Sequence, residues 1–167
     1  CSSDLDGSLP KDVVIGNWAK PWNVKSNRAI GGYLSGELWA IDPKGFEQIG
    51  CVYTVQGFEY DWNGVIFGPD LVWSENKWIA IPSGSKDPAM RGIDPSNFEK
   101  LIKNTYKVLL TRGLQGTLLY SIDKETQEYF AKLTKLTKLM KEYKYILVYS
   151  IIILLFLSLI LYYMFKF

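Results

Sequence analysis

Histidine is absent from this sequence of 167 residues, and cysteine occurs only twice, as Cys1 and Cys51. Without histidine, the Ser-His-Asp and Cys-His arrangements of nucleophilic catalysis are excluded. The two cysteines form no Cys-x-x-Cys pair, so a structural zinc site is excluded as well. We expect Cys51, which lies in an apolar run, to be a small buried core residue, and the body of the protein to lie in the reducing cytoplasm.

A general excess of positive charge is also missing. The net charge is only +2, and it is unevenly divided along the chain. Residues 1–130 hold 13 Lys and Arg against 16 Asp and Glu, whereas residues 131–167 hold 6 against 1. Binding of nucleic acid through bulk charge is therefore excluded for residues 1–130, and any such contact there needs a local patch.

The loop Gly-x-x-x-x-Gly-Lys-Ser/Thr, which holds nucleotide phosphates in P-loop NTPases, does not occur in the sequence. What the chain does contain is a stretch at residues 53–61 that lies between two short apolar runs, 49–53 and 65–67. Such runs predict buried strands of a parallel sheet. Between them, Gly57 would let the backbone approach a ligand closely, and Glu59 could accept hydrogen bonds from a ribose hydroxyl. A plain strand-to-helix turn is the alternative interpretation.

A second notable stretch is Tyr106-Lys107-Val108-Leu109-Leu110-Thr111-Arg112-Gly113. Together with Thr54-Val55-Gln56-Gly57-Phe58-Glu59, it resembles motifs V and VI in the second RecA-like domain of superfamily 1 helicases. Further stretches match in order and spacing, at residues 12–17, 38–43, 64–71 and 119–126. As a set, these motifs resemble the C-terminal part of the Schlafen group 3-like DNA/RNA helicase domain, over residues 9–130.

The resemblance implies an α/β fold, a RecA-like second lobe of the P-loop NTPase type with a mostly parallel sheet. It implies that Arg112 is catalytic and points a guanidinium at the γ-phosphoryl group of ATP. Gln56, Gly57 and Glu59 would bind the same cofactor, and Thr54 would contact nucleic acid. The phosphate loop and the Mg²⁺ ligands are expected from an N-terminal RecA-like lobe of the same protein. For Arg112, a surface arginine near a helix end, favoured by the helix dipole, is the alternative.

Aromatic residues in the loop at residues 17–36 give a further candidate site. Trp18 and Trp22 could stack on bases of single-stranded DNA or RNA, because cations lie near them in the sequence. The alternative is that both tryptophans close the edge of the core.

Local signals predict several other elements. Asp94-Pro95, followed by apolar residues at steps of three and four, predicts one helix over 95–110, with Gly113 as its C-cap. A hairpin is predicted across 73–81, a helical turn over 56–62, and a helix from Lys124 capped by Asp123. Strands are predicted at three further places, which are residues 13–15, 38–41 and 117–122.

The two ends are expected to differ from the body. Residues 1–8 are interpreted as an assembly scar and leader, so the chain is expected to be a piece of a longer protein. Residues 145–165 carry no charge and would span about 32 Å as a helix, which predicts a transmembrane helix. Residues 131–144, rich in lysine, would form a basic juxtamembrane helix that keeps the body cytoplasmic and anchors it to the inner membrane. A frameshift in A/T-rich DNA is the alternative origin of this tail.

Two functions follow as hypotheses. In the first, the chain supplies the motif V and VI half of the ATP site and part of the nucleic-acid path in an ATP-dependent DNA/RNA helicase-like protein. It would then be an ATPase only together with the N-terminal lobe. In the second, it is a membrane-anchored nucleotide- or nucleic-acid-binding module without ATPase activity.

Overall fold

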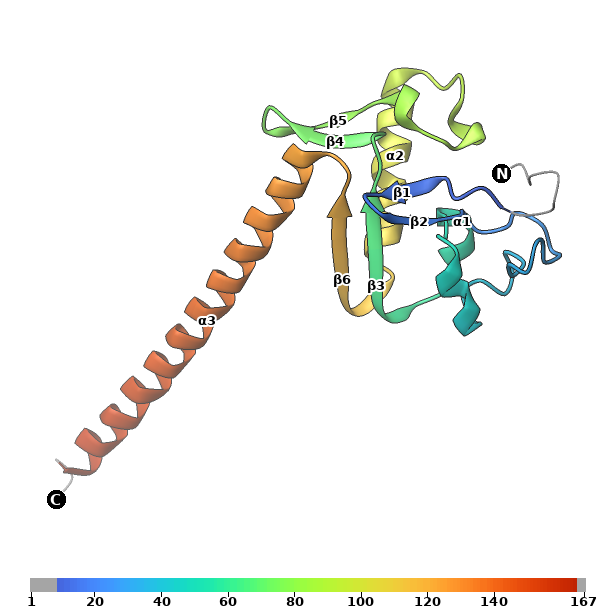
Figure 1. Ribbon diagram of the computed structural model, residues 1–167. Coiled ribbons are helices and arrows are strands. Elements are labelled where there is room, and N and C mark those ends of the chain that lie inside the picture. Colours follow the sequence, from blue (N-terminus) through green and yellow to red (C-terminus); the bar gives the residue numbers. More distant parts are fainter. Residues whose placement is uncertain (1–8, 165–167) are drawn as a thin grey trace. The chain divides into compact units, whose positions relative to one another are not determined.

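The computed structural model describes residues 9–164, except for the side chains of residues 141, 142, 146, 147 and 155–164 (Figure 1). The chain divides into two compact units, Cys1–Thr126 and Gln127–Phe167. The described strands are β1 (Val13–Ile15), β2 (Trp18–Lys20), β3 (Tyr60–Phe67), β4 (Leu71–Ser74), β5 (Lys77–Ala80) and β6 (Gly113–Ser121). The helices are α1 (Val52–Val55), α2 (Pro95–Leu110) and α3 (Lys124–Met164), with 3₁₀ turns η1 (Pro43–Glu47), η2 (Pro82–Gly84) and η3 (Pro88–Met90).

The prediction of a RecA-like lobe with a mostly parallel sheet is wrong. The strands within residues 9–164 form three sheets of two strands each, and only β3 and β6 are parallel. Residues 38–41 form turns, and residue 49 makes only an isolated bridge with Trp22. Residue 51 then caps α1, so the expected strand over residues 49–53 does not form. Short apolar runs are ambiguous between strand and helix, and here tertiary contacts decided against strands.

The parallel pair is the part of the fold that positions the candidate site. β3 and β6 start together, with Tyr60 opposite Gly113, and they end together, with Phe67 opposite Ser121. The helix α2 lies between them in the sequence, as in a βαβ unit, and packs against β3. Three of its side chains are buried, those of Phe98, Ile102 and Tyr106. The spacing of four residues between them explains why this helix has one apolar face.

The predicted helix over 95–110 is confirmed. The carboxylate of Asp94 accepts hydrogen bonds from the backbone amides of Ser96 and Asn97, and Pro95 occupies the first helical position. The predicted C-cap is wrong, because Thr111 and not Gly113 ends the helix. Gly113 instead begins β6, where a Cβ atom would lie 2.3 Å from the carbonyl oxygen of Gly116. Close approach of the backbone at Gly116, three residues further along the same strand, therefore explains this glycine.

The predicted hairpin is also confirmed, as β4 and β5. Its two turn residues, Glu75 and Asn76, have φ angles of 51° and 59°. Positive φ at both central residues matches the turn type that suits the twist of antiparallel strands.

An aromatic contact connects β3 with α2. The Phe67 ring stacks on the Tyr106 ring, with their centroids 4.0 Å apart. This aromatic contact joins the end of β3 to the C-terminal half of α2.

The predicted strand over 13–15 is confirmed as β1, and the last strand, predicted over 117–122, corresponds to β6, which begins earlier, at Gly113, and ends at Ser121. α3 begins at Lys124 as predicted, and Asp123 accepts a hydrogen bond from the backbone amide of Thr126 at 2.8 Å. Cys51, expected in the core, is only half-buried.

The predicted transmembrane helix over residues 145–165 is not supported. Within the part of the chain that the structure describes, no helix combines the length and the apolar character needed to cross a membrane. Side chains from residue 155 onward lie outside the described residues. The structure therefore does not support the predicted C-terminal membrane span, and the hypothesis of a membrane-anchored module loses its basis.

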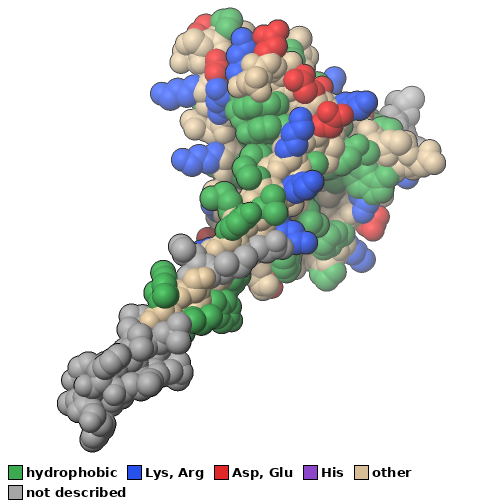
Figure 2. Space-filling view, turned by 90° about the vertical axis from the view of Figure 1, so that its left-hand side faces the viewer, with side chains coloured by type: hydrophobic (Ala, Val, Ile, Leu, Met, Phe, Trp, Pro, Cys, Tyr) green, Lys and Arg blue, Asp and Glu red, His purple; other side chains and the backbone are tan. Residues whose placement is uncertain are grey.

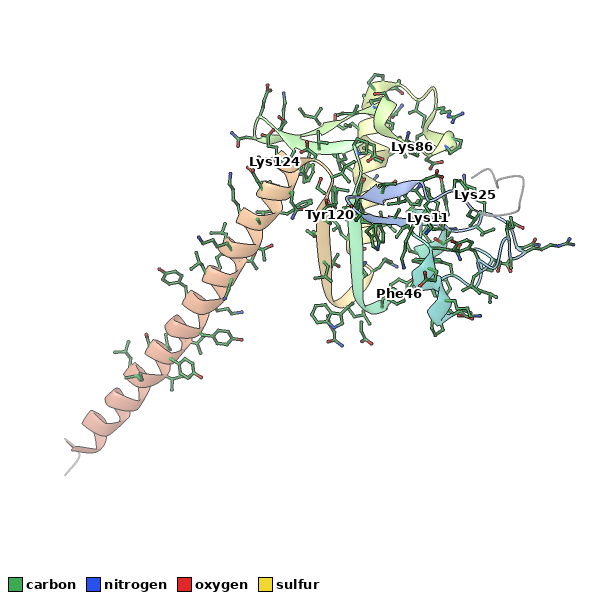
Figure 3. All side chains as sticks on the ribbon, viewed as in Figure 1. Lys11, Lys25, Phe46, Lys86, Tyr120 and Lys124 are labelled. Carbon is green, nitrogen blue, oxygen red and sulfur yellow. The ribbon has the colours of Figure 1, made fainter. Side chains whose placement is uncertain are left out.

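The sheet of β3 and β6 leaves apolar side chains at the surface. Leu114 and Leu118 on β6 are 66% and 69% exposed, and Tyr120 lies on the same strand (Figure 3). Hydrophobic side chains are visible among lysines and arginines on the face that Figure 2 shows. Exposed apolar residues of this kind are common singly, but their concentration on one strand is unusual for a parallel pair.

Candidate nucleotide site

The segment at residues 51–57 forms a short helix that ends in a turn. Thr54 donates a hydrogen bond to the carbonyl oxygen of Cys51 at 2.9 Å and accepts one from the amide of Cys51 at 3.0 Å. The hydroxyl of Thr54 is therefore engaged in capping α1. Gln56 is the C-cap of this helix, and Gly57 follows with φ +85°. The predicted helical turn over 56–62 is wrong, because the helix comes earlier and Tyr60 already belongs to β3.

The turn leaves its polar groups facing solvent. Gln56, Gly57 and Glu59 are all exposed. Among the described residues, the side chains of Gln56 and Glu59 make no hydrogen bond or ion pair. A Cβ atom on Gly57 would have nothing within 4 Å, so the backbone conformation requires glycine and the surrounding space does not. These three residues form an open polar segment that is free to contact a ligand.

Arg112 lies directly beside this segment. Its Nη1 donates to the carbonyl oxygen of Phe58 at 3.4 Å, and its Nε donates to the carbonyl oxygen of Val108 at 3.2 Å. Its Nη2 donates to the hydroxyl oxygen of Thr111 at 3.3 Å. In return, the backbone amide of Tyr60 donates to the carbonyl oxygen of Arg112 at 2.9 Å. The structure thus brings together Arg112 and the turn at Gly57, which are far apart in the sequence.

The guanidinium of Arg112 keeps spare hydrogen-bonding capacity. An arginine side chain carries five N–H donors, and the three contacts just given use one donor each. Two N–H groups remain for a ligand. A fixed fork of donors with a permanent charge suits phosphate oxygens better than the flexible ammonium of a lysine.

The meeting place is at the amino ends of β3 and β6, where Tyr60 lies opposite Gly113. Open α/β sheets usually bind ligands at the carboxyl ends of their strands, so this candidate site lies at the opposite end of the parallel pair. At the carboxyl end of β3 lies Asp70 instead, which accepts a hydrogen bond from Tyr106 at 2.7 Å. Burial raises the pKa of the Asp70 carboxyl, while the bond from Tyr106 opposes the rise.

Two further groups lie near Arg112. Burial raises the pKa of the Tyr60 hydroxyl, and the charge of Arg112 acts in the opposite direction. The Tyr60 hydroxyl oxygen is buried without a hydrogen-bond partner in the described structure. At the protein surface, the side-chain amide of Gln115 donates to the carboxylate of Asp61 at 3.0 Å, and this bond links β6 to β3. Asp61 is exposed and serves as a cross-strand partner at this point.

The two tryptophans proposed for base stacking lie on a different segment. Trp18 begins β2 opposite Ile15 and is 39% exposed. Trp22 is half-buried and forms a parallel bridge with Ile49, close to the start of α1. The contacts described for residues 9–164 do not link Trp18 to Arg112 or to the turn at Gly57. Of the two tryptophans, only Trp22 has a described contact close to the start of α1.

Sequence reasoning missed two side chains that support the site. Asn63 on β3 and Thr117 on β6 both donate to carbonyl oxygens at the end of α2. Asn63 lies two residues before Val65 and Thr117 lies two residues before Leu119, so each polar residue shares a strand face with an apolar one. A polar residue where the strand period calls for an apolar one was the signal that could have identified them. In the described part of the chain, no cluster of three or more Cys, Asp or Glu side chains could hold a metal ion.

Comparison with known proteins places the chain in a family. The family model described as "Schlafen group 3, DNA/RNA helicase domain" matches residues 3–123. The chain belongs to this family. The two stretches that meet at Arg112 and Gly57 both lie within the residues matched by this Schlafen group 3 domain. The family resemblance is thereby confirmed.

A curated relative extends well beyond the matched region. The "Uncharacterized protein YPL245W" of Saccharomyces cerevisiae is 31% identical over 98 residues, which cover 54% of this chain and 22% of the relative. The chain thus spans about a fifth of the length of that relative. No solved structure matches this Schlafen group 3 domain significantly.

Proposed function

We propose that this chain supplies the motif V and VI half of the ATP site in a helicase-like protein. Arg112 would face the phosphates, and Gln56, Gly57 and Glu59 would lie along the sugar and phosphates. The observation that carries the proposal is the contact between the Arg112 guanidinium and the carbonyl oxygen of Phe58. It joins two separate motifs of the Schlafen group 3 domain into one surface with free donors and acceptors.

The chemistry of this half-site follows from its groups. The two free N–H groups of Arg112 can bind phosphate oxygens and stabilise the negative charge that spreads over a transferring γ-phosphoryl group. The carboxylate of Glu59 can accept hydrogen bonds from ribose hydroxyls. The phosphate loop and the Mg²⁺ ligands would come from an N-terminal lobe of the same protein. We therefore expect binding of ATP, but no hydrolysis, from this chain alone.

A nucleic-acid path belongs to the same proposal. Trp18 would stack on a base of single-stranded DNA or RNA, since its ring is partly exposed. Thr54 belongs to α1, and Trp22 lies close to the start of that helix through its bridge to Ile49. Gln56, which ends α1, would couple this path to the nucleotide. Coupling of that kind needs both ligands to contact one rigid element.

The test is binding of an ATP analogue labelled on the adenine base, which leaves the ribose and phosphates free. Fluorescence anisotropy would compare the unchanged chain with Arg112→Ala and Arg112→Lys. We expect Arg112→Ala to weaken binding about 10- to 100-fold, because a hydrogen bond to a charged group contributes about 1.5–3 kcal/mol. Arg112→Lys should give a smaller loss, since the charge stays but the fork is gone.

The control is Arg91→Ala, which removes an exposed arginine outside the candidate site. We expect it to bind the analogue like the unchanged chain. An equal loss for Arg91→Ala and Arg112→Ala would mean that the analogue senses only general charge. No loss for Arg112→Ala would contradict the proposed function.

A further inference from the structure

The last turn of α2 is held by an unusual number of side chains. Carbonyl oxygens at the end of a helix lack partners inside the helix, and here those of residues 107–110 each accept a side-chain hydrogen bond. The bonds run from Thr111 Oγ1 to Lys107 at 3.0 Å, from Arg112 Nε to Val108 at 3.2 Å, from Asn63 Nδ2 to Leu109 at 2.8 Å, and from Thr117 Oγ1 to Leu110 at 3.1 Å. The carbonyl oxygen of Lys107 also accepts from the backbone amide of Thr111 at 3.2 Å.

Two of these four donors, Thr111 and Arg112, directly follow the helix, and the other two come from the sheet. Asn63 belongs to β3 and Thr117 to β6, and they are direct partners in the register of the parallel pair. Because both strands contribute one donor at the same level, the end of α2 is fixed against the sheet at two adjacent points. Arg112 follows two residues after the end of the helix and is bound to the same turn through its Nε. A movement of this turn would therefore move the guanidinium.

The Asn63 side chain is a costly way to stabilise the fold. Its Nδ2 makes the bond to Leu109, but its Oδ1 is buried and has no partner in the described structure. A buried polar atom without a partner costs about 1–3 kcal/mol, while an ordinary hydrogen bond contributes only about 0.5–1.5 kcal/mol. The carbonyl oxygen of Leu109 also accepts from the backbone amide of Arg112 at 3.4 Å. Stability alone thus gives little reason for asparagine at this position.

We propose that Asn63 and Thr117 are positioning residues for Arg112. They fix the last turn of α2 so that the guanidinium stays beside Phe58 with its two free N–H groups available to a phosphate. This inference rests on the proposed function of Arg112 as a nucleotide contact. A site whose charged group is misplaced by about 1 Å can lose much of its effect, which makes such supporting bonds significant.

The first variant is Asn63→Leu, which keeps the approximate size of the side chain and removes both its donor and its unpaired acceptor. We expect the midpoint of urea unfolding to stay unchanged or to rise, while the affinity for the base-labelled ATP analogue falls about 10-fold. Opposite changes in stability and affinity would not arise if Asn63 only supported the fold.

The second pair of variants addresses Thr117 separately. Thr117→Val keeps the shape but loses the hydroxyl, whereas Thr117→Ser keeps the hydroxyl and loses a methyl group. We expect Thr117→Val to lower the affinity about as much as Asn63→Leu does, and Thr117→Ser to bind like the unchanged chain. Circular dichroism at the binding temperature would show that each variant is folded, so that partial unfolding does not imitate the loss.

The outcomes separate this inference from the proposed function. If Arg112→Ala weakens binding but Asn63→Leu and Thr117→Val do not, the positioning inference is overturned and the proposed function stands. If their affinity falls only in proportion to the unfolded fraction, the two residues are structural and the inference is overturned as well. If Arg112→Ala binds like the unchanged chain, both are overturned.

Discussion

At the scale of single residues, two glycines in the first unit allow a clean comparison. A Cβ atom would meet nothing within 4 Å at either Gly57 or Gly64, but only Gly57 has a positive φ, at +85°. We predict that Gly57→Ala lowers the free energy of unfolding by about 1–2 kcal/mol, because an L-residue is strained in that conformation. Urea unfolding followed by tryptophan fluorescence would measure it.

The control for this prediction is Gly64→Ala. Its backbone lies outside the left-handed region, so alanine should be neutral or stabilise by about 0.4–1 kcal/mol through the unfolded chain. Equal losses of unfolding free energy in the two variants would mean that the added methyl group, and not the backbone conformation at Gly57, causes the destabilisation. That result would remove the structural reason given for Gly57.

At the scale of elements, the junction of β3 with α2 depends on the half-buried carboxyl of Asp70. Tyr106 donates to Asp70 at 2.7 Å and accepts from the amide of Gly68 at 2.9 Å. Burial, the largest cause, raises the pKa of Asp70 above its ordinary value of 3.8. The folded protein therefore holds this proton more tightly than the unfolded chain does. The resulting stability is present below pH 3.8 and is lost as the pH rises through the folded pKa.

Asp70→Asn should remove this loss of stability at higher pH. The amide oxygen of asparagine can still accept the hydrogen bond from Tyr106, but it carries no charge at any pH. We predict that the variant is more stable than the unchanged chain at pH 7 and that its advantage shrinks as the pH falls toward 3.8. Urea unfolding between pH 3 and pH 8 would measure both curves. Asp12→Asn, at an exposed aspartate, is the matched control. An advantage that grows toward acid pH would contradict the prediction.

The helix α3 illustrates how spacing decides what an element can present. Its exposed lysines Lys132, Lys135 and Lys138 recur every three residues. Three residues turn an α-helix by about 300°, so successive lysines are displaced by about 60° around the axis. The lysines therefore wind around the helix and do not form one basic face. Contact with a straight strand of phosphates could use only some of them at a time.

At the scale of the whole molecule, the charges predict two separate contributions to nucleic-acid binding. Residues 1–130 have more acidic than basic residues, whereas residues 131–167 are basic. We predict that Trp18→Ala weakens binding of a labelled single-stranded oligonucleotide about 10-fold at every salt concentration, because stacking depends little on salt. Replacing Lys132, Lys135 and Lys138 by glutamine should instead flatten the salt dependence, by about 1–2 in the slope of log K against log salt.

Fluorescence anisotropy between 50 and 200 mM salt would test both effects in the full chain. Trp62→Ala is the control for Trp18→Ala, because Trp62 is also exposed but lies on β3 against Gly116. A change of the salt slope in Trp18→Ala, or an equal loss of affinity in Trp62→Ala, would contradict the proposed stacking role.

The sequence by itself determined the elements whose signals are local. Asp94, Pro95 and the apolar residues at steps of three and four are sufficient to define α2 without any distant contact. The family, too, could be recognised from the motifs around Gly57 and Arg112. The strands expected at residues 38–41 and 49–53 failed because distant partners decide that region. The buried side chain of Gln48 accepts from the amide of Val24 at 2.9 Å and donates to the carbonyl oxygen of Leu34 at 3.3 Å.

Only the tertiary structure decided where the candidate site is and what supports it. The chain brings Arg112 beside Phe58 because β3 and β6 pair in parallel and start at the same level, which is a non-local choice of register. The bonds of Asn63 and Thr117 to the end of α2 follow from the same pairing. Residue types and spacing along the chain suggested a candidate nucleotide site, and pairing across the sheet brings its residues together at the amino ends of the strands.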